Sequence, residues 1–503
     1  MYRYFVRVTA VVIVAMLAGY GFGHGCARTE EGLPSSFKRS EWMPVAGDGG
    51  VLSGGFGSAS NFASRGIACY NGDLYVGTQN ADFSHLNERF GVKPLCMFWI
   101  LTYCLLKWSG SVAPLLQIAP FLVPVHSLYS QGCEIWRYSE RADAWAPVVS
   151  DASGAMLPAG FGTARNFAAS VVQPFKEALY VGTSTSSLRG CEIWRFDGSA
   201  WKRVADRGLG DRHNSGIWSS TIFRGHLYVG TMNWKHGCQI YRSRDGRHWD
   251  TVRQPGGPGF GTRANVYAWS MGVYRGRLYV GTCNLQDDRG AELWRYDGCT
   301  WEHVGLPGGD GFGDPANYGI RSLLVFRDEL YVGTTASFAQ RQKGAELWRY
   351  NGRRWTPVVG DSARVSDGFG DPANKWMWSM QVVNDELWVG TLNVWPALVR
   401  GPLSSDGCEI WRYNGWWWRN VVGAWRGEMP GGFDDRGNVG ARSMLEYPPG
   451  SGTIYIGTWY FDLHDYEDFS GCELWKRTPS DDRYTSNARE PVLRNVKDSE
   501  GFL

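Results

Sequence analysis

Apolar and polar residues alternate over short segments along most of this chain, and the segments return in the same order about every fifty residues. Such alternation predicts half-buried β-strands, and Asp-Gly and Asn-Gly pairs between them predict tight hairpin turns. A complete copy contains four such segments. In one copy they are Trp269–Tyr274, Leu278–Thr282, Glu292–Tyr296 and Trp301–Val304. The pattern therefore predicts four antiparallel strands per repeat.

The second strand carries the string Leu-Tyr-Val-Gly-Thr or a close variant, which occurs seven times. The copies are Leu74–Thr78, Leu179–Thr183, Leu227–Thr231, Leu278–Thr282, Leu330–Thr334, Leu387–Thr391 and Ile454–Thr458. A Gly-x-Glu-[Ile/Leu]-Trp-Arg-Tyr segment or variant follows each one. A repeat of this length with several strands is typical of a β-propeller. The sequence thus predicts an all-β, seven-bladed β-propeller.

The two ends of the repeat region predict how the ring closes. The last copy stops after its third strand, Cys472–Arg477, and has no fourth. Near the N-terminus, Trp42 and Val45 match the Trp-x-x-Val of a fourth strand. We expect this N-terminal strand to complete the last blade, which hides an open sheet edge. The predicted domain covers about 38–480, with a polar C-terminal tail over 481–503.

The hairpin Arg-Tyr-[Asp/Asn]-Gly-x-x-Trp carries a resemblance that covers nearly the whole mature chain. It resembles secreted bacterial and archaeal β-propellers of the kelch-like and Asp-box-like kind. Two features depart from that pattern. The kelch double glycine is missing from the expected strand, and Ser243–Trp249 is one residue shorter than a full Asp-box. The resemblance implies the fold and says little about chemistry.

The N-terminus has the pattern of a secretory signal over residues 1–26. Arg3 and Arg7 precede an apolar run, Val8–Leu17, which is followed by small residues. An uncleaved anchor and lipidation at Cys26 are the alternatives. The sequence therefore predicts an exported protein that is extracellular, periplasmic or anchored at the cell surface.

Charge and cysteine usage exclude several classes of partner and site. The chain has 51 Lys+Arg against 49 Asp+Glu, a net charge of +2, so no nucleic-acid partner is expected. No Cys-x-x-Cys pair or Cys/His metal spacing occurs, so no metal site is predicted, and the cofactor is unknown. One repeat position holds a cysteine in five copies, and we expect these to be buried free thiols: Cys133, Cys191, Cys238, Cys408 and Cys472.

Residues present in nearly every copy are expected to serve the fold. A glutamate recurs in the third-strand segment, with Gln239 in its place once, and an asparagine recurs before each first strand. The glutamates are Glu134, Glu192, Glu292, Glu346, Glu409 and Glu473, and the asparagines are Asn61, Asn166, Asn214, Asn265, Asn317, Asn374 and Asn438. A ring of equivalent acids has no acid/base asymmetry, so we interpret both sets as structural hydrogen-bonding residues.

The residue four positions after each of these asparagines varies, and it is expected at the channel end of the first strand. The seven residues are Arg65, Ser170, Trp218, Trp269, Arg321, Trp378 and Arg442. The variable loops after the second strands add Trp234, Trp395 and Trp459. Tryptophan stacks on sugar rings and arginine binds carboxylates, so we predict a glycan site on the loop face around the central channel. The alternative is that the arginines pair with Asp314 and Asp371 while the tryptophans plug the channel.

Two other functions remain open. A carbohydrate-active enzyme, either a polysaccharide lyase or a glycoside hydrolase, would use groups on the same face. Its candidates are His213, His236, His464, Asp211, Asp462, Asp465, Glu467, Tyr267, Tyr318 and Tyr466. A cell-surface protein-interaction scaffold is the third possibility, and Trp416 and Trp417 in a turn on the opposite face are candidates for partner contact.

The first repeat carries a long hydrophobic insertion over about 81–130. Its apolar run Leu95–Leu106 is too short for a confident membrane span. Three interpretations stand: a lid or membrane-touching loop, a partner-binding insertion, or a segment foreign to the protein. Membrane contact is expected only through this insertion or the N-terminus.

Overall fold

The structure is a computed structural model that describes residues 42–81, 130–185, 189–285, 289–338, 340–394, 405–423, 427–461 and 470–479. The predicted signal segment, nearly all of the insertion, the C-terminal tail, Trp395 and His464 lie outside the described residues. So do Asp462, Asp465, Tyr466 and Glu467. Within the described part, no helix is both long and apolar enough to span a membrane.

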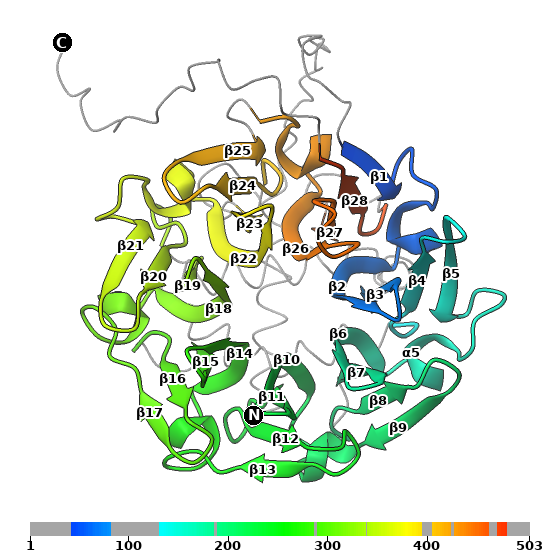
Figure 1. The fold of residues 1–503 in the computed structure, drawn as a ribbon, viewed down its shortest axis with the longest axis horizontal. Coiled ribbons are helices and arrows are strands. Elements are labelled where there is room, and N and C mark those ends of the chain that lie inside the picture. Colours follow the sequence, from blue (N-terminus) through cyan, green and yellow to red (C-terminus); the bar gives the residue numbers. More distant parts are fainter. Residues whose placement is uncertain are drawn as a thin grey trace, which may run out of the picture. The chain divides into compact units, whose positions relative to one another are not determined.

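The described strands follow one another in groups of four antiparallel neighbours, arranged in sequence order around a central axis (Figure 1). The innermost strands are β2 (Asn61–Tyr70), β6 (Asn166–Phe175), β10 (Gly216–Phe223), β14 (Asn265–Tyr274), β18 (Asn317–Phe326), β22 (Asn374–Val383) and β26 (Asn438–Glu446). The second strands are β3 (Asp73–Asn80), β7 (Ala178–Thr185), β11 (His226–Met232), β15 (Arg277–Asn284), β19 (Glu329–Ala336), β23 (Glu386–Asn393) and β27 (Ile454–Tyr460).

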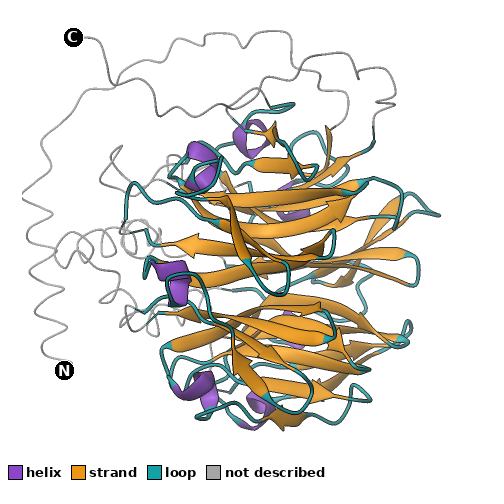
Figure 2. Cartoon of the chain, turned by 60° about the vertical axis from the view of Figure 1, so that its left-hand side comes forward, coloured by secondary structure: helices purple, strands orange, loops and turns teal. Residues whose placement is uncertain are grey.

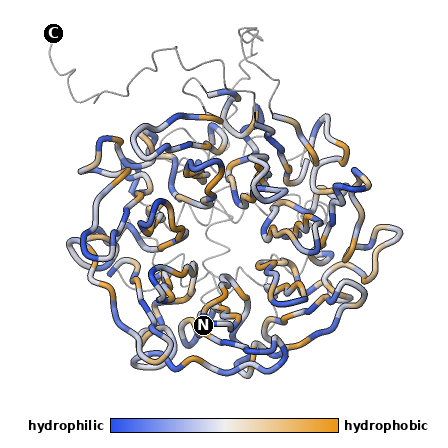
Figure 3. Tube along the Cα trace, viewed as in Figure 1, coloured by the Kyte–Doolittle hydropathy of each residue, from blue (hydrophilic) through white to orange (hydrophobic). Residues whose placement is uncertain are grey.

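Two further strands lie outside these pairs. The third strands are β4 (Ile135–Ser139), β8 (Ile193–Phe196), β12 (Ile240–Ser243), β16 (Leu293–Tyr296), β20 (Leu347–Tyr350), β24 (Ile410–Tyr413) and β28 (Leu474–Arg477). The outermost strands are β5 (Ala144–Val149), β9 (Trp201–Ala205), β13 (Asp250–Val252), β17 (Trp301–His303), β21 (Trp355–Val359), β25 (Trp418–Val422) and β1 (Trp42–Ala46). Hydrophobic and hydrophilic stretches are interspersed around the whole ring (Figure 3).

A closed ring links the groups. The second strand of each group bridges to the innermost strand of the next, and β27 bridges back to β2 between Trp459 and Ala63. Among the described strands, the 14 innermost and second strands form this ring, and the others lie outside it. The all-β prediction is confirmed, and this arrangement is consistent with a β-propeller.

The N-terminal strand β1 pairs with β28, as the Trp-x-x-Val pattern predicts. Trp42 lies opposite Arg477 and Pro44 opposite Trp475. The Trp42 ring packs edge-on against Phe433 at 5.1 Å, and its Nε1 donates to Glu428 at 3.3 Å. The outermost strand beside β28 is therefore β1, which lies more than 400 residues earlier in the sequence.

A four-residue helical turn precedes each innermost strand. These turns are η1 (Gly54–Gly57), α5 (Ala159–Gly162), η2 (Arg207–Gly210), η3 (Pro258–Gly261), η4 (Asp310–Gly313), η5 (Asp367–Gly370) and η6 (Gly431–Asp434), which Figure 2 draws as short purple coils. In η3 the Phe260 ring stacks on Trp294 at 4.6 Å and meets Trp301 edge-on at 5.1 Å. The turn thus anchors the start of one strand group to the third and outermost strands nearby.

The recurring polar residues form one network per group, which confirms their structural interpretation. In the group of β22 to β25, Asn374 Nδ2 donates to Gly368 O at 2.9 Å and to Glu409 Oε2 at 2.7 Å. The same carboxylate accepts from Trp411 Nε1 at 2.9 Å. In the group with Gln239, Tyr241 replaces the tryptophan and its hydroxyl donates to Gln239 Oε1.

The five cysteines at the shared repeat position are free thiols and fully buried, as expected. Each lies in the apolar core between strands. The Cys408 backbone N–H donates to Asn438 O at 2.8 Å, so this position also links one group to the next. A small side chain is required there because the chain packs tightly against the following helical turn.

Candidate functional site

The variable ring residues sit at a β-bulge in the middle of the innermost strands. The predicted strand Trp269–Tyr274 begins four residues earlier, at Asn265, and its register shifts between Ala268 and Ser270. Trp269 is therefore the extra residue of the bulge, and no residue of β15 pairs with it. The same shift occurs at each equivalent position, which holds Arg65, Ser170, Trp218, Arg321, Trp378 and Arg442. Bulges re-aim side chains and are frequent beside functional sites.

A glycine on the second strand lies opposite each bulge. Its close packing explains why the repeated string Leu-Tyr-Val-Gly-Thr has glycine at this position in all seven copies. A Cβ atom on Gly281 would lie 2.5 Å from Ile320 Cγ2 on the next innermost strand and 2.6 Å from Ser270 Oγ. Only glycine leaves room for both. The repeated glycine therefore lets neighbouring groups pack closely while the bulge turns its side chain toward the axis.

Arginine and tryptophan side chains from different groups pack together at this level. The guanidinium carbon of Arg65 lies 4.2 Å from the Trp218 ring centroid, and that of Arg442 lies 4.6 Å from Trp378. Arg321 lies 5.5 Å from Trp269 and 5.9 Å from Trp378. These are cation–π distances, so each arginine of the ring packs on tryptophan side chains of nearby groups.

Trp269 and Trp378 are almost wholly buried, with 5% and 2% of their surface exposed. Trp269 stacks on Tyr267 at 5.3 Å, and Trp378 meets Trp459 edge-on at 5.1 Å. Rings covered in this way present little free face for a sugar. For these two residues the structure favours the channel-plug alternative over the stacking site.

The channel-plug alternative also predicts that the arginines pair with Asp314 and Asp371. The structure does not support this pairing. Asp314 lies 3.3 Å from Lys343 Nζ, and Asp371 Oδ2 accepts from Asn393 Nδ2 at 2.9 Å. Arg65 Nη1 donates to the neutral Gln79 at 3.0 Å. The Nε atoms of Arg65, Arg321 and Arg442 are buried and have no hydrogen-bond partner in the described part of the chain.

Burial perturbs all three guanidinium groups. Removal from water, together with the charge of Arg321, lowers the pKa of Arg65 to about 9. Removal from water lowers the pKa of Arg321 to about 10. The pKa of Arg442 falls well below its usual value because of burial and then repulsion from Arg65 and Arg321. The three groups thus form a cluster of like charge that packs on tryptophan rings but has no acidic partner among the described residues.

A cavity of about 290 Å³ adjoins this cluster. Beyond the ring residues it is lined by the side chains two positions further along each strand, such as Ile67, Met271, Leu323 and Met380. It therefore extends toward the short turns that end the innermost strands, and not toward the loop face that the sequence predicts. Its described lining contains no carboxylate or histidine.

Of the remaining predicted aromatic residues, the described Trp234 and Trp459 do not line this cavity. Trp234 and Trp459 are half-buried, and they lie near the ends of second strands, where Trp234 contacts Tyr267 at 6.0 Å between ring centroids. Trp395 lies outside the described residues. The cavity thus lies on one side of the ring of Arg65, Trp269 and Arg321, and Trp234 and Trp459 lie on the other.

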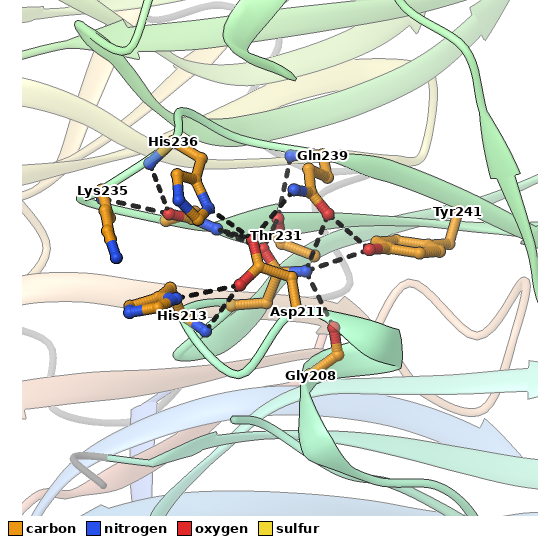
Figure 4. Close-up of polar contacts among 10 residues, drawn as sticks. Gly208, Asp211, His213, Thr231, Lys235, His236, Gln239 and Tyr241 are labelled. Carbon is orange, nitrogen blue, oxygen red and sulfur yellow. Dashed lines mark hydrogen bonds and ion pairs between the residues drawn. The ribbon is translucent and has the colours of Figure 1, made fainter. Parts of the chain in front are cut away.

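Three of the predicted enzyme residues converge elsewhere, beside β10 and β11 (Figure 4). His213 Nδ1 lies 3.1 Å from Asp211 Oδ1, and His236 Nδ1 lies 2.7 Å from Asp211 Oδ2. Burial raises the pKa of Asp211, but hydrogen bonds from His236 and His213 outweigh it and bring the pKa to about 2. Tyr267 and Tyr318 are not part of this group: Tyr318 Oη accepts from Trp376 Nε1 at 3.0 Å.

A larger groove of about 970 Å³ lies on the outside of the ring, between the outer strands of two groups. Trp416 and Trp417, in the turn between β24 and β25, line it and are 77% and 48% exposed. Arg327, Arg354 and Arg364 line the same groove. The sequence singled out the two tryptophans, whereas the arginines come from a neighbouring group and become visible only in the structure.

No family model and no curated protein matches this chain. Solved structures match its fold weakly. A structure of U3-55K has a TM-score of 0.43 at 9% identity and covers 87% of this chain and 99% of its own. A Trypanosoma rangeli sialidase in complex with sialic acid has a TM-score of 0.37 at 11% identity, covering 61% of this chain and 53% of its own. An Aleuria aurantia lectin mutant in complex with Fucalpha1-6GlcNAc has a TM-score of 0.34 at 10% identity, covering 72% and 95%. The site must therefore be interpreted from its own residues.

Proposed function

We propose that this chain is an exported, seven-bladed β-propeller that binds an acidic carbohydrate in its central channel. The observation that carries the proposal is the cluster of Arg65, Arg321 and Arg442, whose buried Nε groups have no partner in the described part of the chain. Buried charges are normally paired, and an unpaired one costs free energy. A bound carboxylate would supply the missing charge and hydrogen-bond acceptors.

The cavity beside the cluster supports a sugar-sized ligand. About 290 Å³ accommodates one monosaccharide unit, and the apolar side chains of Ile67, Met271 and Leu323 suit the C–H face of a pyranose ring. A carboxylated sugar at the end of a glycan combines both features. Binding is favoured over hydrolysis because the described lining lacks the two carboxylates that a glycosidase uses.

The test is calorimetric titration of the purified full chain with D-glucuronate, D-galacturonate and N-acetylneuraminate, using D-glucose and D-galactose as neutral controls. At least one acidic sugar should bind and the neutral sugars should not. Arg321→Gln and Arg442→Gln should each weaken binding by about 10- to 100-fold, since each removes a charge-assisted hydrogen bond worth roughly 1.5–3 kcal/mol. Arg353→Gln, which alters an exposed turn residue, is the matched control and should bind normally.

Two results would overturn the proposal. One is the absence of binding by every acidic sugar. The other is binding that Trp416→Ala abolishes while both channel variants keep it, because the ligand would then occupy the outer groove, where exposed Trp416 and Trp417 offer stacking surfaces.

A further inference from the structure

The side chains of Asp211, His213 and His236 come together beside the loop that follows β11 (Figure 4). One ligand atom from each lies within 4.8 Å of the others. Asp211 and His213 precede β10, and His236 follows β11, so the β10–β11 hairpin brings the two segments together. The rings of His213 and His236 are 5.1 Å apart at an interplanar angle of 72°. Both rings direct Nδ1 at the same carboxylate.

The other repeats provide an internal control for this cluster. The position of His213 holds Ala264, Ala316 and Ala373 in three other copies. The position of His236 holds Lys343 in one of them, and Lys343 Nζ lies 3.3 Å from Asp314, the counterpart of Asp211. A cation beside this aspartate is therefore a feature the fold uses elsewhere, although Lys343 also pairs with Glu346 and Asp361. The copy that contains β10 and β11 differs from those three copies because it has two imidazole side chains beside the aspartate.

The surroundings of Asp211 hold its carboxylate in place. Oδ2 accepts from Asn233 Nδ2 at 2.9 Å and from Gln239 Nε2 at 3.1 Å, and Oδ1 accepts from the His213 backbone N–H at 3.0 Å. Gln239 stands where six other copies have glutamate. This substitution turns an acceptor into a group that donates to Asp211, and partners of this kind orient the ligands of metal sites.

We propose that Asp211, His213 and His236 bind a divalent transition-metal ion of the zinc type. Two imidazole nitrogens and one carboxylate oxygen are a donor set that suits Zn²⁺ and not Mg²⁺ or Ca²⁺, which prefer oxygen ligands. The His236 side chain is 42% exposed, so the site adjoins solvent. Three protein ligands leave one coordination position for water or a ligand group, unlike a closed structural zinc site.

The sequence did not predict this site because its ligands follow no motif spacing. Asp211 and His213 are separated from His236 by a complete strand hairpin, and only the pairing of β10 with β11 brings them together. The site is independent of the channel cluster, since neither histidine nor Asp211 lines the channel cavity.

The test uses the untagged full chain, stripped of metal by chelation. Calorimetry with Zn²⁺ should give one tight site, and Co²⁺ should produce the visible absorption of a four-coordinate ion. His213→Ala and His236→Lys install the residues that other copies carry, so both variants should fold. Each should weaken Zn²⁺ binding by at least about 100-fold. Loss of a residue that only orients a metal ligand weakens binding by about 10- to 100-fold, so a larger effect indicates that a ligand was lost.

His248→Ala is the control, because His248 Nδ1 also contacts an aspartate, Asp245 at 2.6 Å, but has no second imidazole in the described residues. It should bind Zn²⁺ as the wild type does. Failure of the wild type to bind Zn²⁺, or unchanged binding in His213→Ala, would show that these residues form only a hydrogen-bonded cluster. Neither outcome depends on whether the channel binds a sugar.

Discussion

Asn61 and Arg65 lie four residues apart on β2, and both are buried, at 0% and 8% exposure. Asn61 uses its full hydrogen-bonding capacity. Its Nδ2 donates to Gly55 O and Glu134 Oε2, and its Oδ1 accepts from Thr78 and Asn80. Arg65 makes one neutral hydrogen bond, to Gln79, and its Nε has no partner in the described part of the chain.

The difference separates what serves the fold from what is available to a ligand. Asn61 has a counterpart in every copy, and the Nδ2 group of each counterpart donates to a glycine carbonyl of the preceding helical turn, although Oδ1 of Asn265 and of Asn438 has no hydrogen-bond partner in the described part of the chain. Arg65 occupies the bulge position, where residue type changes from copy to copy. The protein leaves this buried group without its full set of hydrogen bonds, and the fold does not require arginine at this position. A bound ligand can supply the hydrogen-bond acceptors that such a group lacks.

The largest expected effect tests the hydrogen-bond network of Asn61. Glu134→Ala should lower the free energy of unfolding by about 3–9 kcal/mol, because it leaves buried donors of Asn61, Trp136 and Ser150 without this acceptor, at roughly 1–3 kcal/mol each. Urea denaturation followed by tryptophan fluorescence measures this change. Glu134→Gln is the control, and its loss should be much smaller because Gln239 fills the equivalent position in one copy. Equal losses in both variants would mean that the charge, and not the acceptor geometry, matters.

The second prediction has the opposite sign and concerns the channel. Arg65→Met should raise the free energy of unfolding by about 1 kcal/mol in ligand-free protein, since an apolar chain can still pack on Trp218 and replaces a buried charge that has no acidic partner among the described residues. The same variant should lose the acidic sugar. Denaturation and titration of one preparation check both. A clear loss of stability would indicate that Arg65 has a partner which the channel cluster does not account for.

The smallest expected effect concerns the insertion in the first repeat. Asn80 Oδ1 accepts from Gln131 N at 2.8 Å and Ser130 Oγ at 3.2 Å, and Asn393 Oδ1 accepts from Asp406 N at 3.1 Å and Ser405 Oγ at 3.3 Å. The two loops thus close in the same way although they differ greatly in length. Replacing residues 86–128 with a short Gly/Ser linker should therefore change the unfolding free energy by less than about 0.5 kcal/mol, as for other changes remote from packed or paired groups. Failure of the shortened chain to fold would place part of the segment in the core.

Much of the fold and part of the site could be predicted from the sequence. Local patterns that repeat along the chain predict the strand order, the hairpin turns and the shared roles of Asn61 and Glu134. They also predict the pairing of β1 with β28. Because the patterns repeat, each can be recognised in several copies. The ring positions of Arg65, Trp269 and Arg442 were also found, because comparing copies isolates the position that varies.

Only the tertiary structure decided where those side chains lie and what they lack. A bulge is a mismatch between two strands, so the sequence of one strand does not reveal that Trp269 and Arg442 turn toward the axis in mid-strand. The lack of a counter-charge for Arg442 among the described residues and the proximity of His213 to His236 both depend on groups brought together from distant segments. Alternation and turn chemistry are properties of neighbouring residues along the chain, whereas charge compensation and ligand geometry are properties of neighbours in space.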